Sequence, residues 1–193
     1  TVTVSIQQAG NPGSDRSIST CANQASFDLF PLLGPGAELG GFWSPALASG
    51  TGVFDPAVDV SGIYTYTIPT VGACVSVSAA ITVTNNPIPT LLTISDFELC
   101  DDTVNGSDTD GFSFFDLTTK NNEISNLQTG VVVTYHLTSS DAINNLNAIT
   151  SLNSESRVMH TRITNSATGC YNTSSFNLVV YVKPSVNPIV NLR

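Results

Sequence analysis

Four cysteines are the residues with the clearest chemistry in this chain of 193 residues, and each of two repeated segments contains two of them. The phrase Phe-Asp-Leu occurs once between Cys21 and Cys74 and once between Cys100 and Cys170. Four cysteines allow three disulfide connectivities, and only one of these keeps every bridge inside a repeat. We therefore predict the bridges Cys21–Cys74 and Cys100–Cys170. Each would stabilise its module by about 4 kcal/mol in the chain-entropy model.

A zinc site is the competing interpretation of these cysteines. Structural zinc sites use closely spaced pairs such as Cys-x-x-Cys. The nearest two cysteines, Cys74 and Cys100, are 26 residues apart and lie in different repeats. The spacing therefore favours disulfides, and since disulfides persist outside the cytosol, it predicts an extracellular or cell-surface location.

A cluster of carboxylates follows the third cysteine and has no counterpart in the first repeat. The spacing from cysteine to Phe-Asp-Leu is 6 residues in the first repeat and 15 in the second. Calcium takes about six to eight oxygen ligands and tolerates irregular geometry, so this insertion is a candidate structural calcium loop. The alternative is a solvated acidic turn in which Asp and Asn side chains cap their own backbone. The candidate ligands are Asp101, Asp102, Asp108, Asp110 and Asp116.

The two histidines do not indicate catalysis. His136 and His160 stand in alternating segments, opposite the apolar positions, so we predict that both side chains face outward. Serine hydrolases commonly place their nucleophile in a Gly-x-Ser-x-Gly turn, and the sequence contains none. Paired carboxylates for glycoside cleavage have no recognisable context here. We therefore predict that this segment is not an enzyme and has no catalytic residues.

Charge and hydropathy exclude two classes of partner. The chain has 15 acidic and 6 basic residues, for a net charge of −9. An acidic surface without a basic stripe argues against binding to nucleic acid or to an anionic membrane. The longest apolar runs, such as 131–133, are far too short to span a bilayer, so we predict no direct membrane insertion.

The elements that must position these residues are short strands. Residues 63–68 alternate apolar and polar side chains, and Gly and Pro separate such segments at intervals of about 8 to 12 residues, as in β-sandwiches. Because the pattern occurs twice, we predict an all-β chain of two tandem Ig-like β-sandwich modules with one intramodule disulfide each. Only residues 116–126 and 141–146 have a pattern that could form short helices, with Asp141 as a candidate helix cap; loops are the alternative there.

The linkers set the predicted domain boundaries. Two prolines in Asn86-Pro87-Ile88-Pro89 stiffen the joint between the modules. Asn187-Pro188-Ile189 repeats this chemistry. We predict the last strand of a preceding module plus a linker at 1–14, module 1 at 15–86, module 2 at 87–186, and a linker to a following module at 187–193.

Several phrases carry a resemblance to a known family. These are TGVFDP at 51–56, GIYTYT at 62–67, and FELCDD at 97–102 followed by DGF at 110–112. They resemble the tandem Ig-like repeats of very large surface proteins of gliding and related Bacteroidota, including the adhesins secreted by the type IX system. The resemblance implies export to the cell surface, long filaments of β-sandwiches, and adhesion to surfaces or polysaccharide. Its implied partners are neighbouring modules and other adhesin subunits.

Two smaller features follow from this resemblance. Gly62-x-Tyr64 is similar to the Ig and polycystic-kidney-disease-type pattern, in which the tyrosine hydroxyl bonds backbone and closes a corner. Asp102-Thr103-Val104 is similar to the Asp-Ser/Thr-aliphatic pattern of O-glycosylation in Bacteroidota. Thr103 is therefore a candidate glycosylation site that competes with calcium for the acidic loop.

The sequence thus predicts a structural and adhesive segment of a large extracellular protein, acting as a semi-rigid spacer for cell-surface adhesion or gliding. One alternative is a polysaccharide-binding module that uses Trp43 and Tyr66. Exposure of both rings on one face would favour that alternative, and burial of both would remove it. For Trp43 we favour the core, because the tryptophan of an Ig-like sandwich commonly packs on its disulfide. A further alternative is an accessory region of a secreted hydrolase.

Overall fold

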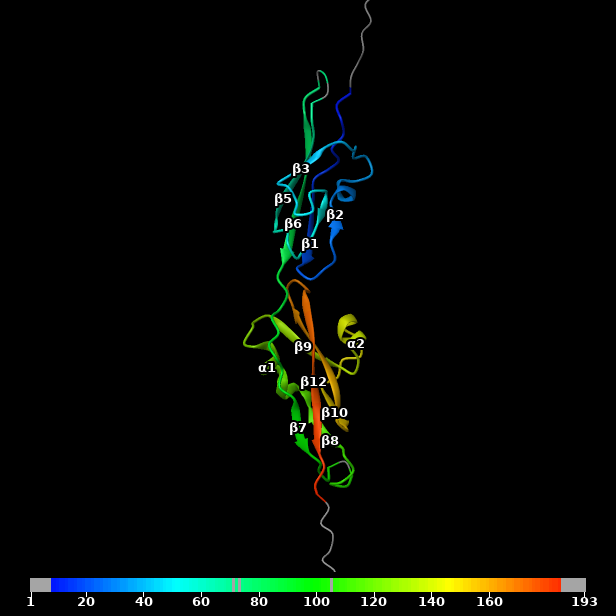
Figure 1. Cartoon of the computed structure of the whole chain (residues 1–193), viewed down its shortest axis with the longest axis vertical. Helices are drawn as coiled ribbons and strands as arrows, with labels where there is room; N and C mark the ends of the chain where they lie inside the picture. Colours follow the sequence, from blue (N-terminus) through cyan, green and yellow to red (C-terminus); the bar gives the residue numbers. More distant parts are fainter. Residues whose placement is uncertain (1–7, 71, 73, 105, 185–193) are drawn as a thin grey trace, which may run out of the picture. The chain divides into compact units, whose positions relative to one another are not determined.

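The computed structural model of the chain describes residues 8–70, 72, 74–104 and 106–184 (Figure 1). The strand predicted within 1–14 therefore lies largely outside the described residues, and the linker predicted at 187–193 lies wholly outside them. The chain divides into two compact units, Thr1–Pro87 (unit 1) and Ile88–Arg193 (unit 2).

Among its described residues, unit 1 is a β-sandwich of six strands. Its larger sheet has the order β1-β6-β5-β3, and β2 pairs with β4 in the smaller one. A 3₁₀ helix, η1 (Phe30–Leu33), follows β2. The strands are β1 (Arg16–Cys21), β2 (Phe27–Asp28), β3 (Phe42–Ser44), β4 (Val53–Phe54), β5 (Gly62–Ile68) and β6 (Val77–Asn86).

Unit 2 repeats this topology strand for strand. Its sheets have the orders β7-β12-β11-β9 and β10-β8. The fold prediction is confirmed: the chain is all-β in architecture, with two tandem Ig-like sandwiches. The strands are β7 (Phe97–Cys100), β8 (Ser113–Asp116), β9 (Val131–His136), β10 (Ser151–Ser154), β11 (Arg157–Asn165) and β12 (Tyr171–Tyr181); the helices are η2 (Leu117–Lys120), α1 (Asn121–Ser125) and α2 (Ser139–Asn144).

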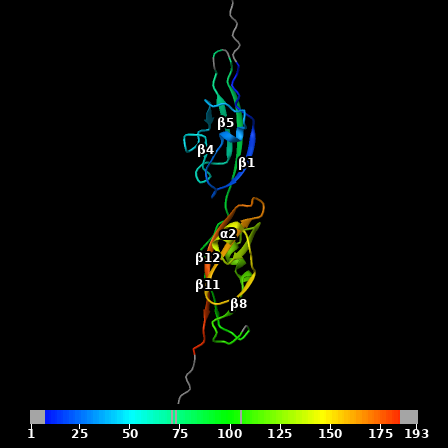
Figure 2. The same cartoon turned by 90° about the vertical axis from the view of Figure 1, so that its right-hand side faces the viewer.

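In both units the first strand runs parallel to the last. β1 pairs with β6 so that Cys21 lies opposite Asn86, and β7 pairs with β12 so that Cys100 lies opposite Tyr181. The remaining pairs of the larger sheets are antiparallel. Figure 2 shows the long strands β11 and β12 of unit 2 side by side. This parallel pairing determines where the cysteines lie.

The repeated phrase Phe-Asp-Leu has one structural role in both units. Leu29 and Leu117 are fully buried in the two cores. Each preceding aspartate accepts a backbone hydrogen bond from two residues further on, Asp28 from Phe30 at 2.9 Å and Asp116 from Thr118 at 3.0 Å. Aspartate caps a turn in this way, and full burial of a leucine contributes about 1.5–3 kcal/mol. The phrase therefore ends a strand, starts a 3₁₀ helix and anchors the core.

The predicted tyrosine corner is present in unit 1. The Tyr64 hydroxyl donates a hydrogen bond to the Val60 carbonyl at 2.8 Å. Burial, followed by the negative charge of Asp59, raises the pKa of Tyr64 above its usual value. The hydroxyl therefore stays protonated and available as a donor.

The prediction for His136 is wrong, because this side chain is fully buried. Its Nδ1 lies 2.6 Å from the Leu146 carbonyl, and its Nε2 lies 2.9 Å from the Thr134 hydroxyl. The segment from α2 to Leu146 covers the outer face of β9 and β11. Leu137, one of the apolar residues that alternate with the polar ones in this segment, lies just beyond the end of β9 and is exposed.

Helices form in both ranges where they were expected, with one shift in a cap, but η1 (Phe30–Leu33) lies outside both ranges. Residues 117–125 form η2 and α1, and α2 spans Ser139–Asn144. The N-cap of α2 is Thr138, whose hydroxyl oxygen accepts a hydrogen bond from the Asp141 backbone at 3.0 Å. Asp141 sits in the first turn and accepts a bond from the same hydroxyl at 2.6 Å. Thr138 thus caps the helix through its hydroxyl, and the Asp141 carboxylate holds that hydroxyl in place.

Candidate functional site

The four cysteines do not pair as predicted. Cys21 and Cys170 are disulfide-bonded. Cys74 and Cys100 carry thiols. Neither predicted intramodule bridge is therefore formed.

The parallel pairing in unit 1 explains why Cys21 does not bridge to Cys74. Cys21 is the last residue of β1 and lies opposite Asn86, the last residue of β6, where the Ala22 amide donates to the Asn86 carbonyl at 2.9 Å. Cys74 precedes the start of β6 at Val77. Ten residues of strand span roughly 30 Å. The Cα atoms of a disulfide lie within about 7 Å of each other, so β6 holds these two cysteines too far apart.

Unit 2 separates its cysteines by the same means. Cys100 ends β7 opposite Tyr181, and the Asp101 amide donates to the Tyr181 carbonyl at 3.0 Å. Cys170 directly precedes Tyr171, the first residue of β12. Because β12 is eleven residues long, it separates the two sulfurs by roughly 35 Å.

Each unit therefore has one cysteine at each end. We call the end where the closing strand begins the proximal end and the end where it finishes the distal end. The chain leaves unit 1 at its distal end, directly after Asn86, beside Cys21. It enters unit 2 at the proximal end, where the Asn172 side-chain amide donates to the Pro89 carbonyl at 3.2 Å, two residues from Cys170. The two bonded cysteines thus lie at the two unit ends that flank the joint in the chain.

The acidic loop next to Cys100 uses its carboxylates mainly for local hydrogen bonds. Asp102 accepts a bond from the Val104 amide at 2.8 Å. Asp110 accepts bonds from the amides of Ser107 and Phe112 at 3.1 and 3.0 Å. Such turns were the alternative to a calcium loop.

The other candidate ligands are also engaged. Asp108 forms an ion pair with Lys183 at 3.0 Å, and this hydrogen bond raises the pKa of Lys183. Asp116 caps η2. Asp101 is buried, with one oxygen accepting from the Gly111 amide at 2.6 Å and the other without a hydrogen-bond partner.

In the described part of the chain, no three His, Cys, Asp or Glu side chains are grouped to hold a metal ion. Calcium binding by the loop stays a prediction, and so does glycosylation of Thr103, which is exposed in the same loop. The described residues also contain no helix with the length and apolarity needed to cross a bilayer.

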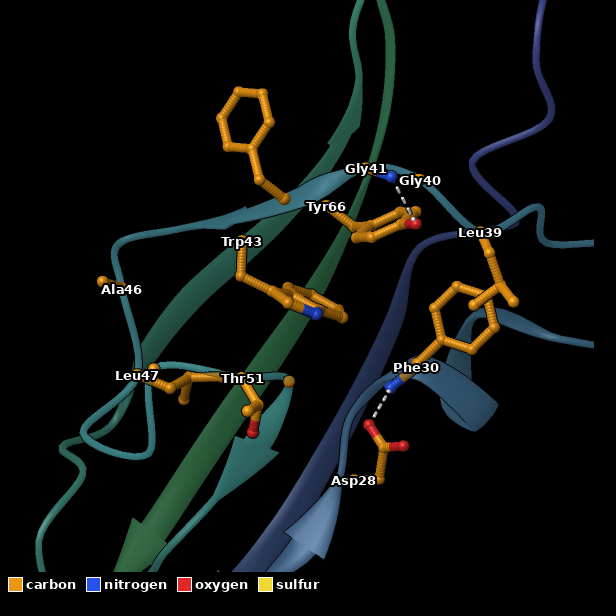
Figure 3. A pocket seen from close by; sticks show the side chains of 13 residues that line it. Asp28, Phe30, Leu39, Gly40, Gly41, Trp43, Ala46, Leu47, Thr51 and Tyr66 are labelled. Carbon is orange, nitrogen blue, oxygen red and sulfur yellow. Dashed lines mark hydrogen bonds between the residues drawn. The ribbon is translucent and has the colours of Figure 1, made fainter.

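Four aromatic residues of unit 1 line a pocket of about 440 Å³ (Figure 3): Phe30, Phe42, Trp43 and Tyr66. Tyr66 is 3% exposed, accepts a hydrogen bond from the Gly41 amide at 2.8 Å and donates one to the Glu38 carbonyl at 3.0 Å. Trp43 is half-buried and packs on Tyr66 with ring centroids 5.2 Å apart. In Figure 3 the Trp43 and Phe30 rings face the same hollow. The two rings that the polysaccharide alternative needs therefore form a pocket wall and not an open flat face.

Sequence reasoning identified the four cysteines but missed how they pair. In each repeat, the second cysteine is separated by nearly the same number of residues from the residue that pairs with the first cysteine. These separations run from Cys74 to Asn86 in unit 1 and from Cys170 to Tyr181 in unit 2. That spacing is visible only once the parallel register is known. A sequence signal of the separation was nevertheless present, since each second cysteine begins a long alternating segment and so must lie a strand's length from its far end.

Comparisons with known proteins give a family match for part of the chain and distant likenesses to solved structures. Residues 96–184 match the model of the family described as "Flavobacterium inter-domain disulphide bond domain". No curated protein matches. Similar solved structures include extracellular domains 3–5 of Drosophila OTK (13% identity, TM-score 0.35, 90% of this chain and 62% of that one) and immunoglobulin domains 1–4 of Sidekick-1 (11%, 0.32, 90% and 47%). The chain thus spans about half to three fifths of these proteins' lengths, and from 96 to 184 it resembles a flavobacterial repeat.

Proposed function

We propose that Cys21 and Cys170 form one disulfide across the joint, and that the chain is a structural segment of an extracellular repeat protein fastened by this bond. The observation that carries the proposal is the position of the two bonded cysteines, one opposite the last residue of β6 in unit 1 and the other at the proximal end of unit 2. The description of the family matched by unit 2 supports it.

A bond between these cysteines changes the mechanics of the chain. Tension applied at the two termini would pass from Cys21 directly to Cys170 and bypass the intervening residues, which hold most of both units. Closing a loop of this length also lowers the entropy of the unfolded chain, by an amount worth roughly 5 kcal/mol. The segment then acts as a spacer that resists extension.

This mechanical role fits a cell-surface spacer for adhesion or gliding. Disulfides form in oxidising compartments, which supports an extracellular location. Pro87 and Pro89 already restrict the joint, and the disulfide adds a second restraint there. In this role the segment projects a binding site that is carried elsewhere in the protein.

Cleavage of the joint tests the disulfide directly. A protease recognition site is inserted between Pro87 and Ile88, the chain is cut, and the products are separated under denaturing conditions. We expect one species without reductant and two fragments after reduction. Cys21→Ser should give two fragments in both conditions, whereas Cys74→Ser should behave like the parent chain. Two fragments from the unreduced parent would overturn the proposal.

Single-molecule stretching from the termini tests the mechanical role. If the bond is present, only residues 1–21 and 170–193 extend, which gives roughly 16 nm at about 3.5 Å per residue. After reduction the whole chain extends, to roughly 68 nm. Equal extensions in the two states would contradict the spacer mechanism.

The pocket favours saccharide binding as a second candidate function. A half-buried tryptophan offers a face on which a sugar ring stacks, and the Asp28 and Thr51 oxygens at the rim are hydrogen-bond acceptors. Trp43 is the chain's one tryptophan, so its fluorescence reports on the pocket directly. Titration with cellohexaose and chitohexaose should give a saturable change for one of them. No change in Trp43 fluorescence with either sugar would contradict this candidate.

A further inference from the structure

We propose that the pocket of unit 1 binds an organic cation, namely a quaternary ammonium group on a short neutral stem, as in choline. The pocket has a volume of about 440 Å³, and its lining includes Trp43, Tyr66, Phe30 and Asp28 (Figure 3). Sites for small ligands commonly have volumes of about 300–1,000 Å³, so there is room for such a group. The inference goes beyond the proposed fastening of the two units, and it depends on neither the Cys21–Cys170 bond nor the saccharide candidate.

The first argument is the arrangement of three aromatic rings around the hollow. Trp43 packs on Tyr66 with ring centroids 5.2 Å apart and planes inclined by 50°, and Phe30 packs on Tyr66 at 5.4 Å and 76°. Because the rings are inclined to one another, a group in the hollow can contact more than one of them. An aromatic face attracts a cation within about 6 Å of its centroid, and clusters of such rings recognise quaternary ammonium ligands.

The second argument is the charge of the lining. Among the described residues that line the pocket, Asp28 is the one that carries a charge. Its Oδ1 accepts the Phe30 amide hydrogen bond at 2.9 Å, which holds the carboxylate beside that residue. The whole chain has a net charge of −9, so its field also attracts positive ligands. The lining is therefore complementary to a cation and repels an anion.

The third argument concerns the kind of cation. The two hydroxyls of the lining are already engaged: Tyr66 bonds the Gly41 amide and the Glu38 carbonyl, and Thr51 donates to the Ser49 hydroxyl at 3.1 Å. A primary ammonium brings three N–H donors that need acceptors in place of water, whereas a quaternary ammonium brings none. A pocket of rings with one carboxylate and engaged hydroxyls therefore favours the quaternary group.

Two glycines keep the pocket in shape before any ligand binds. A Cβ at Gly52 would lie 2.8 Å from Trp43 Nε1 and 3.2 Å from Asp28 Oδ1, and one at Gly41 would lie 2.6 Å from the Tyr66 ring. Backbone thus lies directly against both rings and limits their movement. Because the rings are already positioned, binding requires little additional ordering of side chains.

Choline and its neutral analogue 3,3-dimethyl-1-butanol test the inference on the full chain. The analogue has the same shape, with carbon in place of the charged nitrogen. Trp43 is the chain's one tryptophan, so its fluorescence follows occupation of the pocket. At constant ionic strength we expect a saturable change with choline and a Kd at least about tenfold lower than for the analogue. Phosphocholine should bind more weakly than choline, because its phosphate adds negative charge near Asp28.

Three variants locate the site. Asp28→Asn keeps an acceptor for the Phe30 amide but removes the charge, so it should weaken choline binding and leave binding of the analogue unchanged. Gly52→Ala displaces Trp43 and should weaken both. As a matched control, Asp15→Asn removes one charge from unit 1 outside the pocket and keeps an acceptor for the Ala80 amide, so choline binding should not change. Urea unfolding of each variant checks that unit 1 remains folded.

Three results would overturn the inference. Equal affinity for choline and its neutral analogue would show that charge plays no part, and unchanged choline affinity in a folded Asp28→Asn variant would show the same. Tighter binding of phosphocholine than of choline would rule out a neutral stem. If cellohexaose or chitohexaose saturates the pocket and choline gives no response, this inference fails and the saccharide candidate stands.

Discussion

Units 1 and 2 share one sheet topology but differ in whether the outer face of the larger sheet is covered. Ser44 pairs with Thr65 in unit 1, at the register position where His136 pairs with His160 in unit 2. Ser44 is exposed, whereas His136 is fully buried. Thr67 and Arg162 occupy equivalent positions on the neighbouring strand, counted from the paired residues. The same face is therefore open in unit 1 and covered in unit 2.

The cover in unit 2 is made by α2 and held by a buried arginine. Arg162 is 8% exposed and donates hydrogen bonds to the carbonyls of Ala142 and Ile143 at 3.2 and 2.7 Å. Its guanidinium lies 3.4 Å from the centroid of the Tyr171 ring. Helix carbonyls need partners at a C-terminus, and arginine supplies several donors in a fixed plane. The comparison teaches that an insertion between two strands converts polar outward positions into a second, polar core.

The largest expected effect tests what the units share. Leu29→Ala and Leu117→Ala remove equivalent, fully buried side chains, so each should destabilise its own unit by about 2–5 kcal/mol. Trp43 fluorescence reports on unit 1 alone, and far-UV circular dichroism reports on both units. In urea unfolding, Leu29→Ala should move the fluorescence midpoint and Leu117→Ala should not. A shift of the fluorescence midpoint by Leu117→Ala would show that the units unfold together.

The second prediction tests the buried arginine that distinguishes unit 2 from unit 1. Arg162→Ala leaves two helix carbonyls without donors and removes the contact with Tyr171, which should cost unit 2 about 2–4 kcal/mol. The matched substitution Thr67→Ala, on the open face of unit 1, should cost less than about 1 kcal/mol. Hydrogen exchange followed by mass spectrometry should show faster exchange over α2 in the arginine variant. Equal losses for the two variants would break the comparison.

A smaller effect concerns the buried tyrosine hydroxyls. Tyr64→Phe removes the bond to Val60 in unit 1, and Tyr135→Phe removes a 2.8 Å bond to the Asn121 side chain in unit 2. Each should cost about 1 kcal/mol, since an intramolecular hydrogen bond contributes about that much on balance. Tyr181→Phe, at an exposed position, is the control and should change the urea midpoint little.

The smallest effect is a pH dependence in unit 2. The Thr138 hydroxyl, followed by the Asn147 side chain, lowers the pKa of Asp141 from its ordinary value of 3.8. Because the folded state binds the proton less tightly than the unfolded state, this contribution is present above about pH 4 and is lost as the pH falls through the lowered value. Asp141→Asn keeps an acceptor for Thr138 but does not titrate. Between pH 5 and pH 2 the variant should lose less stability than the parent chain does, as measured by thermal unfolding of unit 2 at each pH. An identical dependence of the unfolding temperature on pH would contradict this.

Several features could be predicted because they depend on local chemistry. The alternation of apolar and polar residues in 63–68 predicts which side chains of β5 face the core. Gly62-x-Tyr64 predicts the hydrogen bond of the tyrosine corner. Both follow from the period of a strand and from a hydroxyl within reach of nearby backbone. The outward prediction for His136 failed because alternation describes one strand and carries no information about a helix that later covers it.

The sequence by itself determined that the chain is a duplication, where the strand at 63–68 lies, and that its cysteines occupy equivalent places in two repeats. Those properties come from spacing and from side-chain polarity, which act locally. Only the tertiary structure decided which cysteines bond, because that depends on the parallel pairing of β1 with β6 and of β7 with β12. A strand is rigid and tens of ångströms long, so pairing in parallel places the two cysteines of each repeat at opposite ends of their unit. The two cysteines of one repeat therefore cannot bond to each other within their unit.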